Sequence, residues 1–92
     1  MAVEIRIPTI LRTFTGGEKA VQGSGDTLLA VIDDVNARHP GIKERLVESD
    51  NLRRFVNVYV NDEDVRFSGG LEAPTADGDV VVVLPAVAGG AA

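Results

Sequence analysis

The fold is decided by the stretch Asp77-Gly78-Asp79-Val80-Val81-Val82-Val83-Leu84-Pro85. Its first three residues are typical of a turn, because Asp side chains bond to nearby backbone and Gly accepts unusual backbone angles. The next five residues form the most apolar and most β-prone run in the chain. A run of this kind belongs in the centre of a sheet. We therefore expect a central strand over residues 80–84.

Three further segments show strand patterns. Val3, Ile5 and Ile7 alternate with charged residues, which predicts a strand with one buried and one exposed face that ends at Pro8. Alternation also predicts a strand over residues 55–60. A short strand is expected over 18–22, which forms a hairpin with the first strand through a long loop with turn residues at 14–17. A very short edge strand is expected over 65–67, after a turn at 61–64.

One amphipathic helix lies between these strands. Leu28, Val31, Ile32 and Val35 follow the i, i+3, i+4, i+7 spacing of a buried helix face. With Asp26 as its N-cap and Pro40-Gly41 beyond its end, the helix is expected over residues 27–39. Residues 42–54 lack a clean period and predict a short helical turn followed by a loop.

This order of elements predicts an α+β domain with a mixed sheet and one main helix packed across one face. If the last strand lies beside the first and pairs with the strand over 55–60, the topology is the β-grasp of ubiquitin. We assign residues 1–85 to this domain. Residues 86–92 carry no charge and, except for Val87, no side chain of the size found in a core, so we expect them to form a flexible C-terminal tail.

Composition excludes several classes of function. A chain of 92 residues provides one domain, and its net charge of −5 disfavours nucleic acid and anionic membranes as partners. The absence of Cys removes disulfides, zinc thiolates and a cysteine nucleophile. Residues 1–12 lack the apolar run of a signal peptide, so a cytoplasmic location is the expectation.

No catalytic constellation emerges from the domain itself. His39, the single His, stands at the expected helix end with no partner for a catalytic triad. Residues 61–64 lack the Gly and Glu of a calcium loop, so no metal site is predicted. Gly23-Ser24-Gly25 is better explained by a tight turn than by phosphate binding, and Asp33-Asp34 by an exposed helix face. The chain is therefore expected to be a carrier or binding module rather than an enzyme.

The tail is the remaining feature. Gly89-Gly90 follows closely after the expected central strand, so its root would be held rigidly. From Pro85 to Gly90 an extended chain reaches about 17 to 20 Å. Small side chains and two Gly residues suit a segment that threads a narrow channel in a partner.

At this point the sequence resembles the ubiquitin-like sulfur carriers of the MoaD/ThiS family, and within it the CysO type. The likeness covers essentially the whole chain and is carried by four stretches. These are Ile7-Pro8-Thr9-Ile10-Leu11-Arg12, Gly25-Asp26-Thr27-Leu28, residues 55–70, and Pro85-Ala86-Val87-Ala88-Gly89-Gly90.

The resemblance implies that a ubiquitin-activating-type enzyme uses ATP to adenylate the carboxyl group of Gly90, and that the carrier binds no cofactor of its own. A sulfur source then converts the adenylate to a thiocarboxylate. The acceptor would be a pyridoxal-phosphate cysteine synthase or another biosynthetic sulfur-transfer enzyme. Gly89, Ala88 and Val87 would thread the partner's channel. A zinc-dependent JAMM peptidase would release the cysteine from its adduct with the carrier.

Ala91-Ala92 departs from this pattern, because the active form in the family ends at the second Gly. Removal of both residues by a peptidase is the favoured explanation; a cloning remnant, or a protein that is not a carrier, are the alternatives. Two other functions stay open, namely a small subunit of a molybdopterin-type synthase and a ubiquitin-like binding module without tail chemistry. Strand alternation puts Leu84 on an outer face, where β-grasp pairing would place it near Phe55, with Tyr59 further along. This face is either a docking surface for a partner or a second small apolar cluster of the domain itself.

Overall fold

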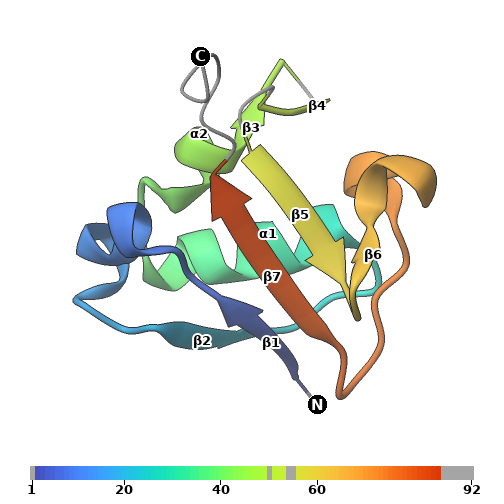
Figure 1. Cartoon of the computed structure of the whole chain (residues 1–92). Helices are drawn as coiled ribbons and strands as arrows, with labels where there is room; N and C mark the ends of the chain where they lie inside the picture. The colour runs from blue at the N-terminus through green and yellow to red at the C-terminus, as the bar shows by residue number, and fades with distance from the viewer. Residues whose placement is uncertain (1, 50, 54–55, 86–92) are drawn as a thin grey trace.

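The computed structural model describes residues 2–49, 51–53 and 56–85. Its main sheet has five strands in the order β2-β1-β7-β5-β6 (Figure 1). The last strand, β7 (Val80–Pro85), lies in the centre, parallel to β1 (Val3–Arg6) and antiparallel to β5 (Val56–Val60). This arrangement is the β-grasp, so the predicted fold class and the central place of the valine run are both confirmed.

The sheet register follows from which side chains must be buried. Ile5 of β1 pairs with Val81, and Val58 of β5 pairs with Val83; all four are at most 3% exposed. The hairpin partner β2 (Ala20–Gly23) runs antiparallel to β1, and the two-residue β6 (Glu63–Asp64) forms the other edge. Alternation along each strand thus leaves one covered and one open face.

The covered face packs against helix α1 (Leu28–Arg38), which crosses behind the sheet in Figure 1. Leu28, Val31, Ile32 and Val35 are all buried, as their spacing predicts. The predicted N-cap was wrong by one residue. Thr27, not Asp26, caps the helix, because its side chain accepts a hydrogen bond from the backbone N–H of Ala30 at 3.2 Å.

Two short segments also differ from expectation. Residues 42–54 do contain a helical turn, α2 (Ile42–Leu46), but β3 (Val47–Glu48) and β4 (Asn51–Leu52) then pair as a small second sheet instead of a loop. The expected edge strand over 65–67 is a 3-10 helix, η2 (Val65–Phe67). Asp64 causes this by accepting a hydrogen bond from the N–H of Arg66 at 2.9 Å.

Among the residues that the structure describes there are two other 3-10 helices, η1 (Thr9–Thr15) and η3 (Gly70–Glu72). The segment η1 occupies most of the connection between β1 and β2, which was expected to be a long hairpin loop with turn residues at 14–17. Within the described residues, no helix is long and apolar enough to cross a membrane.

Candidate functional site

The tail begins after the last residues of β7, Leu84 and Pro85, which we call the tail root. The pairing between β7 and β1 stops at Val82 and Arg6, whereas the pairing between β7 and β5 continues to Pro85 and Val56. Pro8 explains the difference, because it lacks a backbone N–H and the chain turns into η1 immediately after it. The last residues of β7 therefore extend beyond β1 and stay paired with β5. This pairing fixes the position of Pro85, after which the tail begins.

The open face of the sheet carries an apolar patch next to this root, formed by Tyr59, Val82 and Leu84 (hereafter the outer patch). Val82 lies opposite Tyr59 in the β5–β7 pair, and Leu84 lies opposite Asn57. Tyr59 and Val82 are partly buried, whereas Leu84 is 46% exposed. Leu84 and Tyr59 thus share the outer face that alternation predicted, and the cross-strand neighbour of Leu84 on that face is the polar Asn57.

Several predicted site residues lie outside the described residues. They are Phe55 of the predicted docking face and the tail residues Val87, Ala88, Gly89, Gly90, Ala91 and Ala92. Their predicted roles stay predictions, as does the division of the chain at residue 85.

His39, Asp33 and Asp34, for which no catalytic role is expected from the sequence, form contacts within the domain. His39 is the C-cap of α1, and its backbone N–H donates to the carbonyl of Val35 at 2.8 Å. Asp33 pairs with Lys43 at 2.6 Å, and Asp34 pairs with Arg38 at 3.0 Å. In the part of the chain that the structure describes, no three His, Cys, Asp or Glu side chains gather in a way that could hold a metal ion.

The Gly23-Ser24-Gly25 turn is also explained by packing. A Cβ atom on Gly25 would lie 2.6 Å from Cβ of Ala30 and 2.7 Å from the backbone nitrogen of Val31, closer than real contacts allow. The absence of a side chain therefore lets this turn approach the first turn of α1, and no phosphate ligand is needed to account for the glycines.

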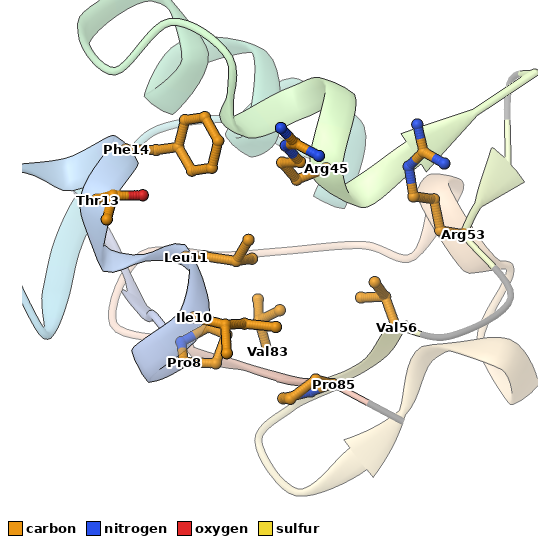
Figure 2. A pocket seen from close by; sticks show the side chains of 10 residues that line it. All are labelled: Pro8, Ile10, Leu11, Thr13, Phe14, Arg45, Arg53, Val56, Val83 and Pro85. Carbon is orange, nitrogen blue, oxygen red and sulfur yellow. The ribbon is translucent and has the colours of Figure 1, made fainter. Parts of the chain in front are cut away.

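A groove opens on the other side of the tail root, between η1 and α2 (Figure 2). Its lining includes Pro85, the last described residue, together with Arg45 and Arg53. Sequence analysis did not find this groove, because its walls come from distant segments without a shared period. The described part of the site thus combines a strand end paired with β5, an apolar patch on one side and a partly cationic groove on the other.

The model of the ThiS family matches residues 5–90. The chain belongs to the ThiS family. This membership and the ubiquitin-like fold confirm the resemblance drawn from the sequence, with the tail included in the matched range.

Individual relatives agree with the family assignment. The sulfur carrier protein CysO of Mycobacterium tuberculosis is 62% identical over 93 residues, covering 98% of this chain and 100% of the relative. A chain in the crystal structure of the Amycolatopsis orientalis BexX/CysO complex is 67% identical, with a TM-score of 0.93 over 97% of this chain and 100% of that one. Small archaeal modifier protein 3 of Haloferax volcanii is 32% identical over 98% of this chain and 100% of its own length.

Proposed function

We propose that this ThiS-family chain is a sulfur carrier, and that it serves as a co-substrate of partner enzymes rather than as an enzyme. The observation that carries the proposal is the match of the family model through residue 90, which includes Gly89 and Gly90. Relatives named as sulfur carrier proteins at 62% identity support it. The fixed end of β7 supports it further, since a carrier must present its terminus at a defined distance from its folded domain.

The chemistry we propose occurs at the carboxyl group of Gly90, once Ala91 and Ala92 have been removed. The carboxylate oxygen attacks the α-phosphorus of ATP in the active site of an adenylating enzyme and displaces pyrophosphate. Sulfide, or a sulfur donor of equivalent chemistry, then attacks the acyl adenylate and displaces AMP. The product is a thiocarboxylate. The two steps leave oxidation states unchanged at the carbonyl carbon, so no redox cofactor is required on the carrier.

The partners we propose follow from those steps. An activating enzyme of the ubiquitin type supplies the adenylation, and a JAMM-type zinc peptidase trims the extension. A pyridoxal-phosphate cysteine synthase, or another sulfur-transfer enzyme, accepts the sulfur. Crystallisation of the A. orientalis relative in a complex with BexX supports protein partners in general. The outer patch, together with Phe55, is the surface that we propose docks the activating enzyme.

The test is the intact mass of the native protein purified without a tag. We expect chains that have lost both Ala residues, a fraction of which carries one sulfur in place of one oxygen. Cells that lack the trimming peptidase should accumulate the 92-residue chain instead. If wild-type cells hold only the 92-residue form while sulfur transfer proceeds, the proposed processing at Gly90 is wrong.

A further inference from the structure

The groove between η1 and α2 is apolar at its floor and positive along one side. Its volume is about 510 Å³, within the range of about 300 to 1,000 Å³ that is usual for binding pockets. Leu11, Val56 and Val83 are buried at its floor, and Figure 2 shows Arg45 and Arg53 together on one side. No Asp or Glu is among its lining residues, although the chain has 14 of them. The groove therefore suits an apolar anchor that is accompanied by negative charge.

The positive side of the groove has a charge to spare. The guanidinium of Arg45 lies 5.2 Å from the centre of the Phe14 ring, a cation–π contact, and Arg45 pairs with no carboxylate among the described residues. Arg53 is more fully engaged, since its Nε donates to the carbonyl of Glu44 at 2.7 Å and its guanidinium lies 3.5 Å from Glu48. Arg45 is thus the cation that an incoming carboxylate would meet.

An anchor of the matching kind is present elsewhere on the same chain. Phe67 in η2 is 86% exposed, and it follows the acidic stretch Asp62-Glu63-Asp64. Asp62 and Glu63 are exposed and form no ion pair within the described part of the chain. The one cation of the segment, Arg66, is engaged, because its guanidinium donates to a backbone carbonyl of β5 at 3.2 Å. The segment from residue 62 to residue 67 therefore combines an exposed aromatic ring with unpaired negative charge.

The segment and the groove belong to opposite sides of the sheet's central strands. The segment follows the edge strand β6, which lies beyond β5 in the sheet order and is drawn with η2 on the far side of β5 from α2 in Figure 1. The exposure of Phe67 shows that its ring does not fill the groove of its own chain. A second copy, however, can bring its Phe67 to the groove of the first.

We infer that this chain associates with itself, with Phe67 of one copy seated in the groove of another. The ring packs on the apolar floor and against Ile10, a rim residue that is 66% exposed. The carboxylates of Asp62 and Glu63 face the guanidinium of Arg45. Two of the three large apolar side chains that are exposed among the described residues, Ile10 and Phe67, are then covered, and the third, Leu84, belongs to the outer patch.

The two contact surfaces differ from each other, so each copy offers one anchor and one groove. Two copies that exchange anchors form a closed dimer, whereas copies that do not exchange them form a ring or an open chain. An interface with one aromatic anchor and exposed charges is small, and we expect a Kd on the order of 100 µM. The association does not rest on the proposed sulfur chemistry.

Sedimentation velocity of the untagged full chain tests the association. The weight-average sedimentation coefficient should rise as the protein concentration increases from about 20 µM to about 1 mM, which brackets the expected Kd. Phe67→Glu removes the anchor, and Arg45→Glu places a carboxylate opposite the acidic segment; each should raise the Kd about tenfold or more. Ile10→Glu is a second groove variant that leaves the contact between Arg45 and Phe14 in place. Lys19→Glu and Leu84→Glu make the same changes in charge outside the two surfaces and should associate like the wild type.

A mixture of two defective variants is the decisive experiment. Phe67→Glu keeps an intact groove and Arg45→Glu keeps an intact anchor, so the mixture should form a dimer with one contact although neither variant associates alone. With only the Phe67→Glu chain labelled with 15N, the backbone amide signals of Leu11, Thr13 and Arg45 should shift. With only the Arg45→Glu chain labelled, the signals of residues 62–67 should shift instead. Melting temperatures check that each variant is folded.

The inference is overturned if the sedimentation coefficient does not depend on concentration up to about 1 mM, or if the mixture associates no better than its components. Shifts at Val82 and Leu84 in place of the groove would assign self-association to the outer patch and would overturn it as well. These measurements use no ATP, sulfur donor or partner enzyme, so a negative result leaves the proposed function standing. A chain that forms no thiocarboxylate could still associate through the groove.

Discussion

Asn61 and Asp79 join the end of β5 to the start of β7. Nδ2 of Asn61 donates to Oδ1 of Asp79 at 2.9 Å, and Oδ1 of Asn61 accepts from the backbone N–H of Val80 at 3.0 Å. Asp79 also accepts from the N–H of Ala76 at 2.8 Å. These contacts fix where β7 begins. They matter for the site because a slip of one residue would turn Val81 and Val83 outward and move the tail root.

The same contacts predict a pH dependence of stability. The hydrogen bond from Asn61, followed by that from Ala76, lowers the pKa of Asp79 below its usual value. A lowered pKa stabilises the fold above the unfolded-state pKa of about 4, and the contribution is lost as the pH falls through the lower folded-state pKa. Asp79→Asn should therefore lower the melting temperature at pH 7, and the difference from wild type should shrink as the pH falls below about 4.

Thermal unfolding at several pH values measures this difference. Glu18→Gln removes an exposed carboxylate elsewhere and should leave the melting temperature unchanged at each pH. A gap between wild type and Asp79→Asn that stays constant down to acidic pH would contradict the assigned role of the Asp79 charge.

The Gly25 turn gives a second prediction, on stability alone. Gly25→Ala should destabilise the domain by about 2 kcal/mol or more, because the added Cβ meets the backbone of α1, which cannot move without disturbing the helix. Gly23→Ala should cost less, since its close contacts are at 2.9 Å with the side chains of Val31 and Val35. Urea unfolding of both variants tests the order, and an equal or reversed order would show that the turn can shift away from the helix.

The predictable parts of the fold are those with a repeated pattern. The valine run before Pro85 located β7, and the spacing of Leu28, Val31, Ile32 and Val35 located α1. A repeated pattern does not predict features that depend on a single side chain. Asp26 and Thr27 are both good N-cap residues, and only the structure shows that Thr27 accepts the hydrogen bond from the N–H of Ala30. A local bond from Asp64 likewise replaced an edge strand with a 3-10 helix.

The candidate site divides in the same way. Alternation along each strand was enough to put Leu84 and Tyr59 on outer faces. Alternation cannot identify the residue opposite Leu84, because register depends on the pairing of two separate strands, and the structure shows Asn57 there. The groove joins Phe14 to Arg45 through packing of η1 against α2, a tertiary contact that no periodicity within either segment encodes.

The outer patch predicts a docking phenotype. Leu84→Glu should weaken binding to the activating enzyme about tenfold or more, because a charge would replace an apolar side chain at the centre of the proposed interface. The fold should tolerate it, since Leu84 is 46% exposed. Phe67→Glu is the matched control, as Phe67 is 86% exposed in η2, outside the patch. Titration calorimetry distinguishes them, and equal affinities for Leu84→Glu and wild type would remove the patch from the interface.

The last prediction concerns the reacting terminus. In a chain that ends at residue 90, Gly90→Ala should reduce the rate of adenylate and thiocarboxylate formation on the order of a hundredfold. A Cβ beside the reacting carbonyl narrows the accessible backbone angles and displaces the carboxylate by about 1 Å from its productive position. Ala88→Gly, in the same segment, provides a comparison that adds no bulk and should react at nearly the wild-type rate.

Mass spectrometry of the products formed with the activating enzyme, ATP and sulfide measures both steps. Melting temperatures of the three chains should agree, because the change lies beyond the domain whose core is formed by residues of α1 and the sheet. Since the stability is unchanged, a lower yield reports on the chemistry at residue 90 itself. Equal yields from the chain that ends at Gly90 and from its Gly90→Ala variant would mean that the diglycine is not the reacting end. The interpretation of the chain as a binding module without tail chemistry would then be preferred.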